Sequence, residues 1–126
     1  MPRPRVVVPL LAGVKALLVE DHEDTRLMYS EALASLGAEV VAVSTATEGL
    51  EKFAELRPHV VISDIGLPDD PYTLSQKAKA SGVPAIALTG RNVRQRALDD
   101  GFCLFLMKPV DPFTLGEEIA RLARPS

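Results

Sequence analysis

Five short apolar runs alternate along the chain with longer segments whose apolar residues recur at helical spacing. Each run has four or five residues; most contain Val or Ile, and the last is rich in Leu and Phe. This length and composition favour strands over helices. The predicted strands are residues 15–19, 39–43, 60–63, 85–88 and 103–107.

The segments that follow the strands have the spacing of amphipathic helices. In the first, Met28, Ala32 and Leu36 outline one apolar stripe, and Gly37 is the type of residue that commonly ends a helix. Pro112 suits the first turn of the last helix, where its missing N–H has little effect. The predicted helices are residues 24–36, 45–56, 72–80, 93–100 and 112–123.

A strand followed by a helix is therefore repeated five times. Because the strands are apolar at nearly every position, they require cover on both faces, which is typical of a parallel sheet with helices on each side. The pattern predicts an α/β fold, with a doubly wound five-stranded parallel sheet at the centre of a three-layer sandwich.

The length of 126 residues fits a single domain, since domains most often have about 100–150 residues. Residues 14–124 are interpreted as that domain, and residues 1–13 as an N-terminal extension outside its core. The extension has arginines before a short apolar stretch, but Pro9 interrupts the stretch. The stretch is also far shorter than the ~18 apolar residues of a membrane span, so we expect neither a signal peptide nor membrane insertion.

Net charge and cysteine content narrow the range of functions and cellular settings that we expect. A net charge of −3 gives no electrostatic reason to expect direct binding to nucleic acid, whose phosphates attract Lys and Arg. Cys103 is the only cysteine, so no intrachain disulfide forms. A lone thiol in an apolar run is usually a small core residue, and this cysteine usage favours a reducing, cytoplasmic setting.

Charged side chains directly follow three of the predicted strands. Glu20 and Asp21 follow the first, Asp64 the third and Lys108 the fifth. The carboxyl ends of parallel strands meet at one edge of a sheet, so we expect these groups to converge. Three carboxylates and one ammonium suit a divalent cation and a phosphoryl group.

Each of these residues also has an ordinary structural explanation. Adjacent acids such as Glu20 and Asp21 are more often part of a solvated turn than of a metal site. A lone aspartate such as Asp64 often caps a turn, and a lone lysine such as Lys108 is usually a surface residue. Their common place after apolar strands favours the functional interpretation.

Four motifs, taken together and in this order, resemble those of the receiver domain of two-component response regulators. The resemblance is to receivers of the chemotaxis type. The four motifs are LLVED at residues 17–21, VVISDIGLP at 60–68, ALTG at 87–90 and FLMKP at 105–109. The resemblance extends over residues 14–123. It implies a flavodoxin-like (βα)5 fold and a phosphoprotein that acts as a signalling switch.

The resemblance also implies a phosphorylation site that needs Mg²⁺. Asp64 would be the phosphoacceptor, since a carboxylate can attack phosphorus when a metal offsets the charge repulsion. Asp21 would bind the metal directly and Glu20 would bind it through water. Asp64 itself and the backbone carbonyl of Gly66 would be the further metal ligands.

Four residues further along the chain have implied roles around the phosphoryl group. Lys108 and Thr89 would bind it, and the family's pattern has a cis peptide bond before Pro109. Thr89 would move toward the phosphoryl group while Phe105 turns inward, which makes these two the implied switch. From the residues alone, Thr89 is an ordinary β-branched strand residue and Phe105 an ordinary core aromatic.

The implied partners are a sensor histidine kinase or phosphotransfer protein and an unidentified downstream protein that recognises the surface around the fourth and fifth helices. His22 and His59 lack a partner at metal-ligand or nucleophile spacing, so both are interpreted as bystanders. The phosphodonor histidine is thus expected on another protein of the bacterial two-component or phosphorelay system. The switch would catalyse only its own aspartyl phosphorylation and dephosphorylation and would not be an enzyme.

Two departures from the family pattern motivate alternatives. Residues 67–72 read LPDDPY and lack the Met and Gly that the family usually has there, which suggests a differently shaped loop beside Asp64. The interval between Thr89 and Lys108 is also shorter than usual. An alternative is a phosphorylation-independent, receiver-like interaction scaffold. A Mg²⁺-dependent phosphatase ranks last, because Gly66 stands where such enzymes have a second acid.

Overall fold

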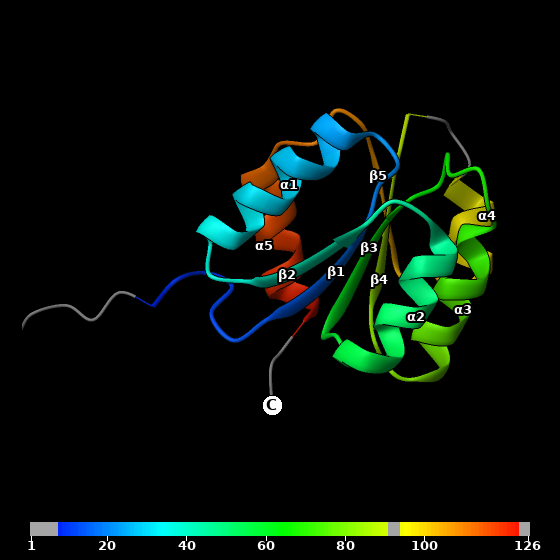
Figure 1. The fold of residues 1–126 in the computed structure, drawn as a ribbon, viewed down its shortest axis with the longest axis horizontal. Helices are drawn as coiled ribbons and strands as arrows, with labels where there is room; N and C mark the ends of the chain where they lie inside the picture. Colours follow the sequence, from blue (N-terminus) through cyan, green and yellow to red (C-terminus); the bar gives the residue numbers. More distant parts are fainter. Residues whose placement is uncertain (1–7, 91–93, 124–126) are drawn as a thin grey trace, which may run out of the picture.

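The computed structural model describes residues 8–90 and 94–123, and within them strands and helices alternate along the chain (Figure 1). The order begins and ends as the sequence predicts, with a strand first and a helix last. The elements are β1 (Lys15–Val19), α1 (Glu23–Ser35), β2 (Glu39–Val43), α2 (Ala46–Leu56), β3 (Val60–Asp64), α3 (Pro71–Ala80), β4 (Ala85–Thr89), α4 (Arg94–Asp99), β5 (Leu104–Met107) and α5 (Pro112–Leu122).

The five strands form one parallel sheet in the order β2-β1-β3-β4-β5. Helices α1 and α5 cover one face of this sheet, and α2, α3 and α4 cover the other (Figure 1). The predicted doubly wound, flavodoxin-like three-layer sandwich is therefore confirmed. The change of direction in strand order lies between β1 and β3, the place where open α/β sheets bind ligands at their carboxyl ends.

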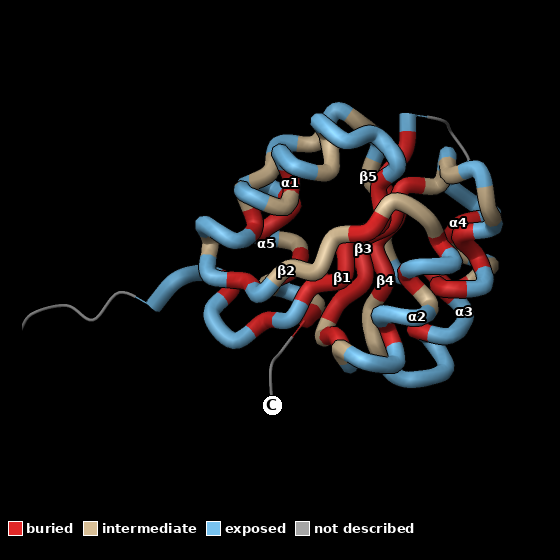
Figure 2. Tube along the Cα trace, in the orientation of Figure 1, coloured by how far each residue is buried: buried red, intermediate tan, exposed pale blue. Residues whose placement is uncertain are grey.

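Buried apolar side chains form one group on each face of the sheet. Successive residues of a strand point to opposite faces. Leu18 and Ile62 accordingly pack with α1 and α5, whereas Leu17 and Val61 pack with α2 and α3. Every residue of β3 and β4 is buried, and Figure 2 shows buried residues concentrated along the central strands. The polar residues that end these two strands are thus buried as well.

Local signals set the ends of the helices where the sequence predicts them. The Asp111 carboxylate accepts a hydrogen bond from the Phe113 N–H at the start of α5, and Pro112 is the first helical residue. Gly37, with φ of 106°, follows the end of α1. Of the helices within residues 8–90 and 94–123, none has the length and apolar character needed to cross a membrane.

The core extends into the predicted N-terminal extension. Leu11 is fully buried among side chains of α1 and α5, and its N–H donates to the Leu36 carbonyl at 2.8 Å. The boundary between residues 13 and 14 stays a prediction, but the packed core begins at least two residues before it. Residues 1–7 of the extension lie outside the described residues.

Cys103 is exposed, which corrects the expectation that it is a core residue. Its Sγ lies 3.4 Å from the Ala85 carbonyl oxygen. The reason is the position of β5, which is an edge strand and begins only at Leu104, so that Cys103 precedes its covered part. The fourth helix was predicted from Val93, which lies outside the described residues; its described part begins at Arg94.

Gly101 lies at the turn before β5 and has no room for a side chain. Its φ is 112°, and a Cβ there would lie 2.7 Å from the Ser75 carbonyl oxygen. We expect Gly101→Ala to lower the free energy of unfolding by about 2–4 kcal/mol, because the positive φ and the clash with the Ser75 carbonyl both destabilise the folded state. Gly82→Ala is the matched control: Gly82 also has a positive φ, of 72°, but a Cβ would meet no described atom within 4 Å.

Urea denaturation of the two variants measures the difference. Gly82→Ala should cost only about 1 kcal/mol, which reflects backbone conformation alone. Equal losses in the two variants would contradict the close approach of Gly101 to α3.

Candidate functional site

Four polar side chains lie at the carboxyl ends of neighbouring strands. Glu20 directly follows β1, Asp64 and Thr89 are the last residues of β3 and β4, and Lys108 directly follows β5. Because the strands are parallel, these ends meet at one edge of the sheet. The convergence predicted for Glu20, Asp64 and Lys108 is therefore present in the fold, and Thr89 lies at the same edge.

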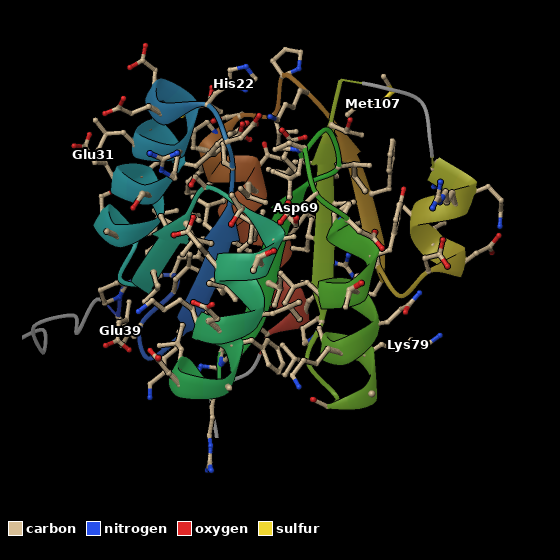
Figure 3. All side chains as sticks on the ribbon, turned by 45° about the vertical axis from the view of Figure 1, so that its right-hand side comes forward. His22, Glu31, Glu39, Asp69, Lys79 and Met107 are labelled. Carbon is tan, nitrogen blue, oxygen red and sulfur yellow. The ribbon has the colours of Figure 1, made fainter. Side chains whose placement is uncertain are left out.

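Figure 3 shows this edge of the sheet. His22, which precedes α1, and Met107, which ends β5, lie at the same end of the molecule, whereas Glu39, which begins β2, lies at the other. The polar groups are thus separated from the amino ends of the strands by the full length of the strands.

The Lys108 ammonium joins two of the carboxylates. Its Nζ lies 2.7 Å from Glu20 Oε2 and 3.5 Å from Asp64 Oδ2. The side chains of Glu20 and Asp64 are only 1% and 8% exposed, so the ammonium provides charge compensation that water cannot. Burial alone lowers the pKa of Lys108, but the hydrogen bond to Glu20 and the charge of Asp64 outweigh it and raise the pKa above 10.5.

Hydrogen bonds fix the side chain of Asp64 and the backbone of Glu20. The Gly66 N–H donates to Asp64 Oδ1 at 2.9 Å. Arg26 Nη1 donates to the Glu20 carbonyl oxygen at 3.0 Å, which connects α1 to the end of β1. Asp64 therefore presents one oxygen to a backbone donor and the other to Lys108.

The ring of His22 lies against the acids, a position that the sequence interpretation missed. His22 Nδ1 is 3.3 Å from Glu20 Oε1 and 3.3 Å from Asp21 Oδ1. The sequence has no second histidine at metal-ligand spacing from His22. The groups that lie near its ring are carboxylates, from the two preceding residues and from the end of β3. His59 behaves differently: its Nδ1 accepts a hydrogen bond from the Lys15 N–H at the opposite edge.

Four side chains can offer ligand atoms to one metal ion. One ligand atom from each of Glu20, Asp21, His22 and Asp64 lies within 4.8 Å of all the others. Carboxylate oxygens are the ligands that Mg²⁺ prefers, and a site open to solvent lets the ion keep several of its waters. The donor set therefore fits the Mg²⁺ that the resemblance implies.

The loop after Asp64 is anchored to α2 by an aspartate. The carboxylate of Asp69 accepts hydrogen bonds of 2.9–3.0 Å from the N–H groups of Ala46 and Thr47 and from the Thr47 hydroxyl. The next residue, Asp70, accepts from the Tyr72 N–H and begins α3. The sequence signalled an altered loop but not this contact, because Asp69 and Ala46 are far apart in the chain.

The turn after β5 lies beside Thr89. The Lys108 N–H donates to the Thr89 carbonyl oxygen at 2.8 Å, and the bond between Lys108 and Pro109 is cis. Thr89 is 1% exposed. Phe105 is partly buried and packs against the apolar cluster on the face of the sheet that α2, α3 and α4 cover. Their implied switch remains a prediction.

The comparisons with known proteins identify the family. Residues 16–120 match the model of the response regulator receiver domain. The chain belongs to the response regulator receiver domain family. This receiver domain is a signalling module of two-component systems and not an enzyme of the ordinary kind.

Its relatives include both regulators and kinases. The receiver domain is 36% identical over 113 residues to an uncharacterized 14.6 kDa protein of Leptolyngbya boryana, with 83% of this chain and 86% of the relative covered. It is 35% identical to the KDP operon transcriptional regulatory protein KdpE and 30% identical to the sensor histidine kinase RcsC, both of Escherichia coli. Here 84% and 87% of this chain match, but the chain spans only 48% of KdpE and 13% of RcsC.

Solved structures agree with this assignment. A CheY-like response regulator receiver domain protein from Methanospirillum hungatei superposes with a TM-score of 0.79 at 31% identity, covering 86% of this chain and 91% of that one. The chemotaxis protein CheY4 of Vibrio cholerae gives 0.80 at 28% identity, with coverages of 88% and 99%. Receiver domains generally bind Mg²⁺ at an acidic pocket, and Glu20, Asp21 and Asp64 form such a cluster here.

The anchor of the loop should make stability depend on pH. Burial by itself raises the pKa of Asp69, but the hydrogen bonds from Ala46 and Thr47 together hold it below 3.8. The contribution of Asp69 is therefore present above pH 3.8 and lost as the pH falls through the lower pKa of the folded state. We expect Asp69→Ala to cost about 1 kcal/mol at pH 7, as loss of a helix cap does, and less at pH 3.

Urea denaturation at the two pH values measures this difference. Glu55→Ala, which removes an exposed acid of α2, serves as the control. A loss for Asp69→Ala that is equal at pH 7 and pH 3 would contradict the role of the charged carboxylate.

The ion pairs of Lys108 should stabilise the fold. Lys108→Ala leaves the buried Glu20 carboxylate without its cation, so we expect the free energy of unfolding to fall by about 1–3 kcal/mol without added metal. Lys52→Ala breaks the exposed pair with Glu55 and should cost less than about 0.5 kcal/mol. Chemical denaturation of both variants in the presence of a chelator provides the measurement. Similar small losses would argue against Lys108 as the compensating charge.

Proposed function

We propose that this receiver domain accepts a phosphoryl group on Asp64 from a sensor histidine kinase or phosphotransfer protein. The observation that supports this most directly is the setting of the Asp64 carboxylate. It ends the central strand, lies 3.5 Å from the Lys108 ammonium, and shares one cluster with two further acids. A nucleophilic carboxylate beside a cation and metal-ligand oxygens is the arrangement that phosphoryl transfer to aspartate needs.

The proposed Mg²⁺ ligands are Asp21, Asp64, the carbonyl of Gly66 and, through water, Glu20. When bound, the ion offsets the repulsion between the carboxylate and the phosphoryl oxygens. The Gly66 N–H already fixes one oxygen of Asp64, so the other oxygen is oriented toward the incoming phosphorus. The protein thus contributes positioning and charge neutralisation.

The transfer proceeds at this oxygen of Asp64. As the O–P bond forms, the P–N bond to the donor imidazole breaks, and the imidazole leaves with the electron pair of that bond. Lys108 then exchanges its contact with Asp64 for one with a phosphoryl oxygen, while its pair with Glu20 persists. Thr89, at the end of the adjacent strand, donates its hydroxyl to another phosphoryl oxygen. Attack of water on the phosphorus later restores the carboxylate.

The signal reaches a downstream protein through the surface around α4 and α5. Thr89 immediately precedes the segment that leads to α4, so its movement toward the phosphoryl group alters the start of that segment. Phe105 packs one strand away and turns into the space that Thr89 leaves. The added negative charge biases a two-state surface that the partner recognises.

We place this switch in the bacterial cytoplasm, where it receives its phosphoryl group from another protein and catalyses only its own phosphorylation and dephosphorylation. Its relatives include a regulator and a histidine kinase of which it spans only part, and a 14.6 kDa protein of which it covers 86%; each of these architectures is compatible with the same chemistry.

One observation favours a second candidate, a scaffold that binds its partner without phosphorylation. Asp69 lies in the loop beside Asp64, and its hydrogen bonds to the first residues of α2 hold the loop against that helix. This contact restricts the rearrangement of the loop. A loop that cannot move would transmit no signal from Asp64.

Intact-protein mass after incubation with acetyl phosphate distinguishes the two candidates. We expect wild type to gain one phosphoryl group when Mg²⁺ is present and none when a chelator removes divalent ions, and Asp64→Asn to gain none in either case. Asp70→Asn is the matched control, because Asp70 lies in the same loop but caps α3, and it should be modified like wild type. Absence of modification in a folded wild type, both with acetyl phosphate and with a phosphorylated donor protein, would favour the scaffold.

A further inference from the structure

His22 has a ring nitrogen directed at two carboxylates, and its backbone N–H donates to Glu20 Oε1 at 3.3 Å. It is the N-cap residue of α1, yet its side chain makes no capping hydrogen bond. Its side chain is 75% exposed, so packing does not dictate the orientation of the ring. Nδ1 nevertheless lies 3.3 Å from both Glu20 Oε1 and Asp21 Oδ1.

These distances fit the edges of a metal coordination polyhedron. With metal–ligand distances of about 2.0–2.2 Å, neighbouring ligand atoms of octahedral or tetrahedral sites lie about 2.8–3.6 Å apart. Both 3.3 Å separations fall in this range, and the set with Asp64 stays within 4.8 Å. One ion can therefore contact the imidazole and the oxygens with little rearrangement.

The two oxygens of Glu20 have different neighbours. Oε2 is taken by the Lys108 ammonium at 2.7 Å, whereas Oε1 faces His22. An ion bound by Asp21 and His22, with Oε1 as a direct ligand in place of the water-mediated contact of the proposed function, therefore need not displace Lys108 from Glu20. The site can hold a metal while Lys108 stays available beside Asp64.

We propose that His22 is a direct ligand of the divalent ion and makes this site select a first-row transition ion over Mg²⁺. Imidazole nitrogen binds ions of the series from manganese to zinc far better than it binds Mg²⁺, which prefers oxygen and retains its waters. A set of three carboxylates and one imidazole thus favours the transition ion. This proposal rests on the metal site of the proposed function, to which His22 adds one ligand.

Isothermal titration calorimetry of the full chain with Co²⁺ and with Mg²⁺ tests the selectivity. We expect wild type to bind Co²⁺ more tightly than Mg²⁺. His22→Ala should weaken Co²⁺ about tenfold but Mg²⁺ less than about threefold. His59→Ala is the matched control, since His59 is the only other histidine of the chain and lies at the far edge of the sheet. Equal changes for the two ions in His22→Ala, or none, would overturn the proposal.

Pulsed electron paramagnetic resonance of the Mn²⁺-loaded protein tests the ligand directly. Wild type and His59→Ala should both show nitrogen coupling from a coordinated imidazole, and His22→Ala should not. A wild-type spectrum without nitrogen coupling would contradict ligation by His22 even if the affinities differ.

The outcomes separate this proposal from the proposed function. If neither ion binds and Asp64 is not phosphorylated, both fail. If Mg²⁺ binds and supports phosphorylation of Asp64, but His22→Ala leaves the selectivity and the nitrogen coupling unchanged, only the role of His22 is wrong.

Discussion

The site depends on one buried arrangement of charge, in which the Lys108 ammonium lies between the carboxylates of Glu20 and Asp64. Two acids with so little exposure would repel each other and lack hydration if no cation joined them. The ammonium comes from the turn after β5, so its position requires the whole sheet to be assembled in the observed order. The stability of the fold and the position of the Asp64 carboxylate beside a cation therefore rely on the same contacts.

Tertiary contacts also connect the neighbourhood of Asp64 to the helices beyond it. The loop after β3 is fixed to α2 by Asp69 and continues into Tyr72, whose ring lies 4.5 Å from the guanidinium of Arg96 in α4. The Ser75 hydroxyl donates to the Asp100 carbonyl at 2.7 Å. The short fourth helix is thus held against α3, which directly follows the loop after Asp64.

The acidic pocket combines family features with one feature of this chain. Three acids and a lysine suit the receiver domain to which the chain belongs, whereas the imidazole of His22 brings a nitrogen donor to an otherwise oxygen-rich site. Metal choice affects such a switch because the bound ion sets how readily the phosphoryl charge is neutralised. The residue that precedes α1 therefore lies at the same pocket as the residues at the ends of the strands.

The sequence by itself determined the fold, since apolar strands that need cover on both faces allow few alternatives to a parallel sheet between helices. It also located Glu20, Asp64 and Lys108, because the end of a parallel strand predicts an edge of the sheet without further information, whereas Thr89 was singled out by the resemblance to the family. Only the tertiary structure placed His22 beside the acids, tied Asp69 to α2, buried Leu11 and exposed Cys103. These outcomes depend on contacts between distant segments or on the direction of a side chain in a turn, and local periodicity contains neither.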